Sequence, residues 1–290
     1  MIYVGTCGFS YRDWIGPFYP DGTKGRDMLA LYSRRFSAVE IDSSYYGVPA
    51  VSTVEGMNAH TPPGFRFSFK LPQTVTHPSD RSQLHSDAAL MRESLAPVAE
   101  SNKLACVLAQ FPHGFKPERD AVSYLKRVID AFEGFQVVVE FRNDRWQTAE
   151  TMELLRDTGA GYSNVDMPQL DGLLSPSSDV TSPVGYVRFH GRNSKQWWRG
   201  TNVTRYAYEY TPEELVQWTD RIAEIEAQAT DTFVFFNNHA SGRAAVNAEA
   251  IEVLLNDRYG EAAPDVVARP EPMPPSRGKR QLDLFADGSE

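Results

Sequence analysis

Short apolar segments alternate along this chain with stretches in which apolar residues recur at helical spacing. The predicted strands are residues 2–7, 38–42, 66–70, 105–110, 136–141, 161–165, 185–190 and 232–237. The predicted helices are residues 26–36, 52–60, 86–102, 119–132, 149–158, 212–228 and 244–256. Eight strands that alternate with helices over residues 2–256 predict an α/β fold, a closed (β/α)8 barrel of the TIM type.

A doubly wound open sheet is the alternative to the barrel. Such a sheet normally carries a glycine-rich phosphate-binding motif after its first strand. Here the first strand ends in Gly5, Thr6, Cys7 and Gly8, and the third glycine of that motif is missing. After residue 258 the chain turns to Pro, Ala and single charges. We therefore expect one barrel domain over residues 1–258 and a flexible, Pro-rich tail over residues 259–290.

Composition and charge exclude several classes of protein. The formal net charge of −9 argues against a surface that coats nucleic acid, so any nucleic-acid contact would be local. The sequence has no apolar run as long as a membrane span, and its N-terminus does not resemble a signal peptide. Cys7 and Cys106 lie too far apart in sequence to form a metal knuckle or a disulfide framework by themselves. We expect a reduced, cytoplasmic protein that does not contact membranes.

Polar residues gather near the carboxyl ends of the predicted strands. Four strands each carry two polar residues on one face, two positions apart: Glu40 and Asp42, Ser68 and Lys70, Glu140 and Arg142, and Arg188 and His190. Three further strands end in Gln110, Asp166 and Asn237. Buried strands are usually apolar, because an unpaired buried charge costs free energy. The carboxyl-terminal mouth of a barrel offers both pairing and solvent, and it carries the chemistry of barrel enzymes. The alternative is a set of structural ion pairs that closes the barrel.

Short motifs follow several of the predicted strands. They are GTCGF at 5–9 with Tyr11, Trp14 and FYP at 18–20, VEIDSSYY at 39–46, FKLP at 69–72, TH at 76–77, QFP at 110–112, VEFR at 139–142 with Trp146, YVRFHGR at 186–192, FNN at 236–238 and NA at 247–248. Together they resemble the YecE-like family, domain of unknown function 72. Asp42 and Tyr45 depart from that pattern, in which Asn and Phe are usual. The resemblance implies a barrel fold and no established activity.

The predicted mouth combines cations with carboxylates. The candidate anion-binding residues are Lys70, Gln110, Arg142, Arg188, Arg192 and Asn237, and the candidate catalytic residues are Glu140, His190, Glu40 and Asp166. Guanidinium groups suit phosphate, and a neighbouring carboxylate or histidine can act as a general acid or base. This pattern favours an enzyme that acts on an anionic, phosphate-bearing substrate, with phosphoesterase-like, nuclease-like or lyase-like chemistry.

A metal site is the alternative for this mouth. Its ligands would be His77, His190 and His239 together with the carboxylates. We do not favour a divalent metal, because the histidines form no compact ligand motif and nearby cations oppose a metal ion. The metal requirement and any cofactor stay open. Cys7 is a candidate nucleophile, although a small buried thiol is the simpler interpretation.

Residues 191–210 interleave cations with aromatic residues. The cations are Arg192, Lys195, Arg199 and Arg205, and the aromatic residues are Trp197, Trp198, Tyr206, Tyr208 and Tyr210. Such a segment suits phosphates and stacked bases. A lid over a small anion, or a packed surface loop, explains the pattern equally well.

The sequence QLDLF at residues 281–285 resembles the peptide by which bacterial replication and repair proteins dock on the sliding clamp. The predicted partner-binding residues are Gln281, Leu282, Leu284 and Phe285. Apolar residues in a disordered tail commonly anchor in a partner's groove, although the tail could instead pack on its own barrel. Three functions remain open: a DNA-associated enzyme recruited by the clamp, a metabolic enzyme for a small phosphorylated compound, and a non-catalytic binding module.

Overall fold

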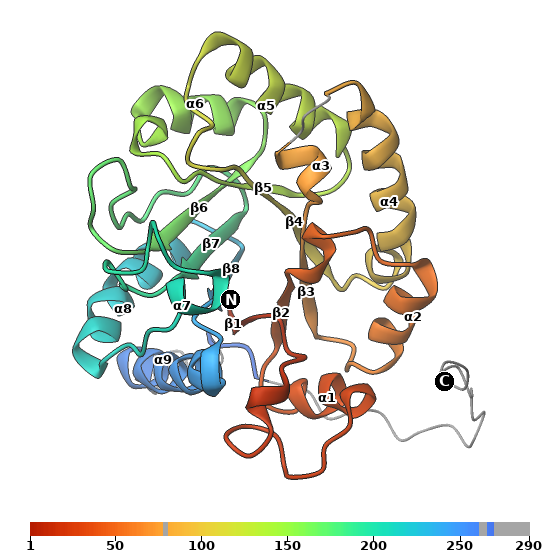
Figure 1. Ribbon diagram of the computed structural model, residues 1–290, viewed down its shortest axis with the longest axis vertical. Helices are drawn as coiled ribbons and strands as arrows, with labels where there is room; N and C mark the ends of the chain where they lie inside the picture. The colour runs from red at the N-terminus through yellow and green to blue at the C-terminus, as the bar shows by residue number, and fades with distance from the viewer. Residues whose placement is uncertain (78–80, 261–265, 270–290) are drawn as a thin grey trace.

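The computed structural model describes residues 1–77, 81–260 and 266–269. In this part of the chain, eight parallel strands close into a barrel in which each strand pairs with its sequence neighbours and β8 pairs with β1 (Figure 1). The strands are β1 (Ile2–Cys7), β2 (Ala38–Ile41), β3 (Arg66–Lys70), β4 (Leu104–Gln110), β5 (Val137–Glu140), β6 (Gly161–Asp166), β7 (Val184–Phe189) and β8 (Asp231–Phe236). The predicted (β/α)8 barrel is confirmed.

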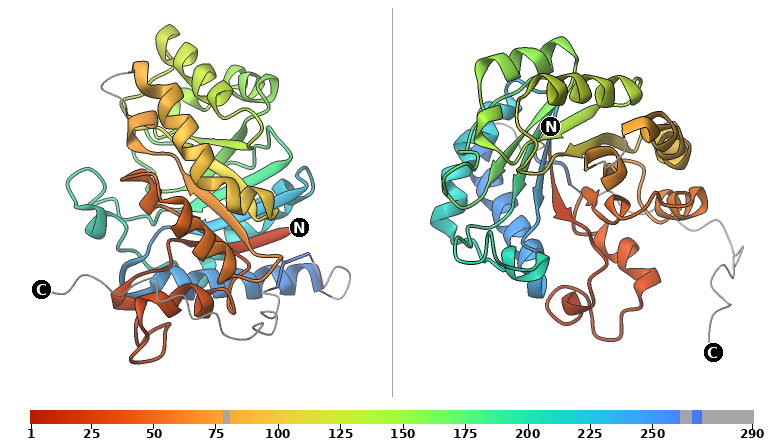
Figure 2. Two further views of the ribbon diagram at one scale, coloured as in Figure 1. Left: turned by 90° about the vertical axis from the view of Figure 1, so that its right-hand side faces the viewer. Right: turned by 45° about the horizontal axis from the view of Figure 1, so that its top comes forward.

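Helices surround the barrel on its outer side, as both views in Figure 2 show. The α-helices are α1 (Gly25–Tyr32), α2 (Val51–Ala59), α3 (Gln73–Thr76), α4 (Leu84–Glu100), α5 (Arg119–Ala131), α6 (Ala149–Asp157), α7 (Asn202–Arg205), α8 (Pro212–Glu226) and α9 (Arg243–Tyr259). Short 3-10 helices are η1 (Arg12–Trp14), η2 (Ser43–Tyr45), η3 (Arg81–Gln83), η4 (Asp144–Trp146) and η5 (Ala240–Gly242). The sequence did not predict α3 and α7, because four residues are too few to show a helical period.

Local sequence explains where the longer helices begin and which face they bury. At the start of α8, the Thr211 hydroxyl accepts a hydrogen bond from the Glu214 backbone, and the Glu214 side chain accepts one from the Thr211 backbone. Pro212 takes the first helical position, where its missing N–H group has no cost. Along α5 the buried positions are Ala121, Tyr124, Leu125, Val128 and Ile129. That spacing forms one stripe, which packs against the barrel.

Two hydrophobic clusters lie on opposite sides of the sheet. The larger cluster fills the space between the strands and the helices, and Trp14, Trp146 and Trp218 belong to it. The smaller one fills the inside of the barrel and includes Tyr3 and Phe233, whose rings stack 5.0 Å apart. Successive side chains on a strand point to opposite faces, so each strand contributes to both clusters. Polar side chains take over towards the carboxyl ends of the strands.

Residues 266–269 belong to the segment expected to be a flexible tail, and the structure places them against β1. The Ile2 backbone N–H donates to the Val266 carbonyl at 2.6 Å, and the Ala268 N–H donates to the Ile2 carbonyl at 2.7 Å. The side chains of Val267 and Ala268 are buried. These four residues therefore pack against β1 at the amino end of the barrel. The rest of that expected tail after Gly260 lies outside the described residues.

Within the described ranges, none of the helices combines the length and the apolar character needed to cross a membrane.

Candidate functional site

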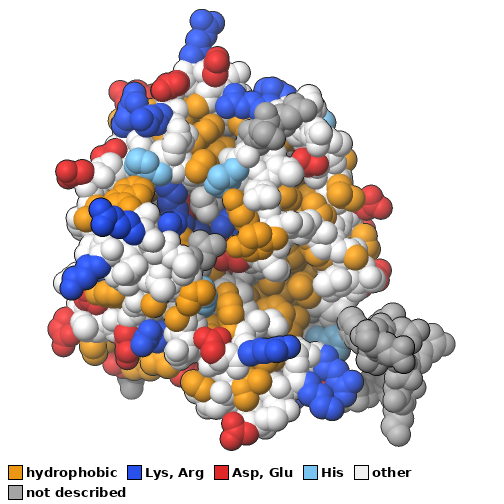
Figure 3. Space-filling model, in the orientation of Figure 1, with side chains coloured by type: hydrophobic (Ala, Val, Ile, Leu, Met, Phe, Trp, Pro, Cys, Tyr) orange, Lys and Arg blue, Asp and Glu red, His pale blue; other side chains and the backbone are white. Residues whose placement is uncertain are grey.

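A cavity of ≈ 500 Å³ opens at the carboxyl ends of the strands. Figure 3 shows it as a hollow with cationic side chains in its depth and histidines at its edge. Its charged and amide lining residues in the described part of the chain are Lys70, Arg142, Arg205, Asp42, Gln110 and Asn237. Its rings are those of Tyr11, Tyr45, Tyr46, Trp197, Trp198, Tyr206, His77, His113 and His239. Four predicted anion-binding residues therefore line one cavity: Lys70, Gln110, Arg142 and Asn237.

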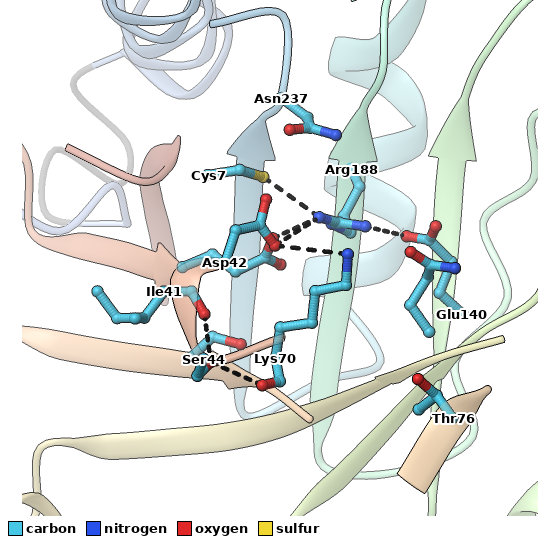
Figure 4. A network of polar contacts seen from close by, with 12 residues as sticks. Cys7, Ile41, Asp42, Ser44, Lys70, Thr76, Glu140, Arg188 and Asn237 are labelled. Carbon is cyan, nitrogen blue, oxygen red and sulfur yellow. Dashed lines mark hydrogen bonds and ion pairs between the residues drawn. The ribbon is translucent and has the colours of Figure 1, made fainter. Parts of the chain in front are cut away.

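Arg188 lies beneath the cavity floor, at the centre of a buried ion-pair network (Figure 4). Its Nη1 donates to Oε2 of Glu140 at 2.7 Å, and its Nη2 donates to Oε1 of Glu40 at 2.5 Å. Nη2 also lies 3.5 Å from Oδ1 of Asp42 and 3.5 Å from the sulfur of Cys7. The Arg188 side chain is 0% exposed, so its charge is balanced by the buried carboxylates of the protein. The structure thus places Arg188 in a supporting position rather than on the surface that a ligand would contact.

Glu140, at the end of β5, is the second centre of this network. Besides Arg188, it contacts Nε of Arg142 at 2.5 Å and Nε2 of His190 at 3.2 Å. Burial by itself would raise the pKa of Glu140, but Arg142 and Arg188 outweigh burial and hold it well below the ordinary value. Glu140 is therefore a buried carboxylate that positions Arg142 at the cavity, and not an acid that faces it.

The two carboxyl groups at the end of β2 have opposite pKa shifts. Burial raises the pKa of Glu40, although Arg188 partly offsets the effect, and the Tyr186 hydroxyl donates to Glu40 at 2.6 Å. Burial would also raise the pKa of Asp42, but Lys70, 3.8 Å away, and Arg188 lower it below the ordinary value. Asp42 lines the cavity and Glu40 lies below it, so Asp42, which the sequence did not single out for catalysis, is the carboxylate that a ligand would meet.

His190 is fully buried under the cavity floor, and both of its ring nitrogens have partners. Nε2 lies 3.3 Å from Oε2 of Glu140, and Nδ1 lies 3.1 Å from the amide nitrogen of Asn237. An ionised carboxylate only accepts and an amide nitrogen only donates, so His190 carries its proton on Nε2. Burial, together with Arg142, lowers the pKa of His190 to about 3. His190 is thus a neutral donor and acceptor within the network.

Asp166 and Arg192 do not join the cavity. Asp166 faces outward from β6 and accepts hydrogen bonds from the Tyr210 hydroxyl and the Trp218 indole, each at 2.7 Å. Arg192 donates to the same carboxylate at 2.7 Å and reaches Glu214 at 3.3 Å. The expectation that Asp166 and Arg192 act at the mouth is therefore wrong in its geometry. Asp166 is one residue out of phase with the inward-facing positions, and its donors hold it between the barrel and α8.

Residues 191–210 form a cover over part of the mouth. Near the two ends of this cover, Arg192 and Tyr210 each donate a hydrogen bond to Asp166. The Trp197 ring is buried and lies 5.9 Å from the guanidinium carbon of Arg142. The Tyr206 ring lies 5.9 Å from that of His190. Four residues of this segment, Trp197, Trp198, Arg205 and Tyr206, therefore line the cavity. The cavity residues Tyr11 and His113 were not among the predicted site residues, because they lie on connecting segments without a strand period. Arg205 belongs to the segment of cations and aromatic residues that the sequence did indicate.

Among the described residues, Cys7, Glu40 and Asp42 form a group that could hold a metal ion. Their donor atoms lie within 4.8 Å of one another, which is the spacing of a metal site. However, Nη2 of Arg188 already contacts all three groups and supplies the positive charge. Burial and Glu40 raise the pKa of the Cys7 thiol well above its ordinary value, which opposes both metal binding and nucleophilic attack. The residues present do not fit a bound divalent cation, and the simpler interpretation of Cys7 as a buried thiol is supported.

The three histidines considered as metal ligands lie in two different environments. His77 and His239 line the cavity, whereas His190 lies below it with both nitrogens engaged. His77 lies edge-on to Tyr45, with ring centroids 5.5 Å apart, and His239 stacks on Tyr11 at 4.8 Å. The histidine set that was the alternative for this mouth is therefore divided between the cavity lining and the network below it.

Comparison with known proteins places this barrel in a family. Residues 3–274 match the family model described as "Protein of unknown function DUF72". The UPF0759 protein YunF of Bacillus subtilis is 33% identical over 98% of this chain and 100% of its own length. A solved DUF72 family protein from Thermotoga maritima is 36% identical with a TM-score of 0.81, over 88% of this chain and 99% of that one. One from Enterococcus faecalis is 27% identical with a TM-score of 0.80, over 88% and 96%. The chain belongs to the DUF72 family.

Proposed function

We propose that this barrel is an enzyme that binds a small, phosphate-bearing anion in its mouth cavity. The observation that carries the proposal is the excess of positive charge on the described lining, where Lys70, Arg142 and Arg205 face a single carboxylate, Asp42. In the described part of the chain, Arg142 pairs with Glu140 through Nε, so its Nη atoms keep their donors for a ligand. The whole chain has a net charge of −9, so the cationic cavity is a local region of positive potential that attracts anions. Its ≈ 500 Å³ suits a small molecule.

The lining also carries groups that can move a proton. Burial, together with Lys70 and Arg142, lowers the pKa of His77 to about 4, so its imidazole is neutral at pH 7. A bound phosphate would offset the charges of Lys70 and Arg142 and raise that pKa towards neutrality, where a general base is most effective. Burial lowers the pKa of His239 as well. A neutral base beside a phosphate site supports hydrolysis of a phosphate ester or elimination next to one. We propose His77 as the general base of this chemistry.

The test is ligand binding measured by calorimetry, with inorganic phosphate and a phosphate monoester as probes. Arg142→Gln and Lys70→Gln should each weaken binding about tenfold or more, because a charge-assisted hydrogen bond is worth roughly 1.5–3 kcal/mol. Lys126→Gln is the matched control, since Lys126 is exposed on α5 and does not line the cavity. Unchanged binding in both mouth variants, with the fold intact by circular dichroism, would refute the anion site.

Catalysis is tested separately from binding. His77→Gln should lower kcat for a phosphate ester at least a hundredfold, a typical contribution of general acid–base catalysis, while phosphate binding changes little. If no ester or elimination substrate is turned over and binding is retained, the protein is a binding module.

A second proposal concerns residues 281–285, which lie outside the described residues. We propose that QLDLF docks on a bacterial sliding clamp and brings the barrel to DNA. Leu284 and Phe285 would fill an apolar pocket, and Gln281 would set the register through its amide. A peptide of residues 279–286 should bind the clamp with modest affinity, and Leu284→Ala with Phe285→Ala should abolish binding without changing the barrel's melting temperature. A lower melting temperature in that double variant would instead identify a structural strap.

A further inference from the structure

Two aromatic side chains at the rim of the mouth are unusually exposed. Trp198 is 52% exposed and Tyr46 is 71% exposed, and both also line the cavity. They come from different elements, because Trp198 lies in the 191–210 cover and Tyr46 directly follows η2. The neighbouring Trp197 is only 3% exposed and packs inward. The rim therefore offers flat apolar surface to a ligand that continues beyond the cavity.

The outer surface of the cover is cationic next to Trp198. Lys195 and Arg199 are exposed, and neither forms an ion pair with a carboxylate in the described part of the chain. Arg192, by contrast, is engaged by Asp166 and Glu214. The cover thus presents positive charge beside an exposed indole.

Hydrogen bonds within the cover also fix its conformation, so that it offers a ligand a preformed surface. The Asn193 side chain donates to the carbonyls of Thr204 at 3.0 Å and Ala207 at 3.3 Å. Thr201 and Thr204 form a reciprocal cap at the start of α7. The Trp198 ring also meets His113 edge-on, with centroids 4.9 Å apart. A ring that is already packed against His113 on a fixed segment loses less freedom when another ring stacks on it.

We propose that the mouth binds the end of a single strand of nucleic acid, with the terminal nucleotide in the cavity and the next base stacked on Trp198. This inference rests on the proposed phosphate site. The cavity offers cations and aromatic rings, and the rim just outside it offers Trp198 with Arg199 and Lys195. A ligand in which a phosphate and a flat ring repeat would match both surfaces in turn. Inside a duplex both faces of each base are covered by its neighbours, and each base is paired, so a base cannot enter the cavity or stack on Trp198 without unpairing.

The experiment compares thymidine monophosphate with 5′-phosphorylated oligothymidylates of two, four and eight nucleotides, by calorimetry on the full chain. Binding should strengthen about tenfold or more from one to two nucleotides, because one further base stacks. Trp198→Ala should remove that gain, so that it weakens the dinucleotide about tenfold more than it weakens the monophosphate. Trp198→Phe should restore most of it. Leu90→Ala, which removes an exposed side chain on α4, is the control and should change neither affinity.

Salt dependence gives an independent readout. Lys195→Gln with Arg199→Gln should reduce the slope of log affinity against log salt for the octamer by about 1.4, since each of the two lost phosphate contacts contributes about 0.7 on a single strand. Equal affinities for one and eight nucleotides, no effect of Trp198→Ala, or equal binding of duplex would each overturn this inference. Those results leave the phosphate site standing, whereas loss of the Arg142→Gln effect on inorganic phosphate refutes the proposed function itself.

Discussion

His190 provides a direct test of the buried network, through the pH dependence of stability. Its pKa is lowered to about 3 in the folded protein, against about 6.5 in the unfolded chain. Below pH 6.5 the unfolded state takes up a proton that the folded state refuses, so stability falls as pH falls. Each pKa unit is worth about 1.36 kcal/mol, and His190 alone should therefore lower the free energy of unfolding by about 2.7 kcal/mol between about pH 7.5 and pH 4.5.

The assay is urea unfolding at a series of pH values, for the wild type and for His190→Gln. The variant removes the titrating ring, so its stability should fall less steeply with acidification by that amount. Other titrating groups around the mouth, including His77 and His239, are common to both proteins and cancel in the difference. His85→Gln removes an exposed imidazole on α4 and is the matched control. If His190→Gln and the wild type show the same pH slope, His190 is not held neutral by its surroundings and the description of the network is wrong.

Two further substitutions test the other buried charges. Asp166→Ala should cost about 3–5 kcal/mol of unfolding free energy, because it leaves Arg192 without its main partner and Trp218 without its acceptor, and urea unfolding measures it. Arg188→Gln should open the donor set of Cys7, Glu40 and Asp42 to a cation, so that Zn²⁺ raises the melting temperature of the variant and not of the wild type. An equal response of both proteins to Zn²⁺ would contradict the assignment of Arg188 as the resident cation.

The strand period was sufficient to predict the barrel and much of the polar mouth. Glu40 and Asp42, like Glu140 and Arg142, stand two residues apart and so share a strand face. Strand ends in a parallel barrel meet at one mouth, which is why these pairs and Arg188 come together in the structure. Convergence thus follows from local geometry and needs no knowledge of tertiary packing.

Depth within the mouth could not be predicted in this way. Arg142 and His190 both stand two residues beyond a buried charge, yet Arg142 lines the cavity and His190 does not. The 191–210 cover lies near both residues, with Trp197 close to Arg142 and Tyr206 close to His190. A cover without a strand or helix period leaves no signal for the side chains that it will shield. From the sequence we consequently expected Glu140, His190 and Arg188 at the surface of the site, whereas all three lie below the residues that line the cavity.

Asp166 shows why strand phase is hard to assign in such a barrel. In the register of β6 with β7, Val165 lies beside Arg188, which points inward, and Asp166 lies beside Phe189, which points outward. A shift of one residue exchanges the two faces of a strand. In strands that are polar on one face only, alternation identifies the inner side, but every residue of β6 is buried because helices cover its outer face. A carboxylate at the end of such a strand has two buried environments open to it. The choice is made by Tyr210, Trp218 and Arg192, which come from later parts of the chain and offer donors on the outer side alone.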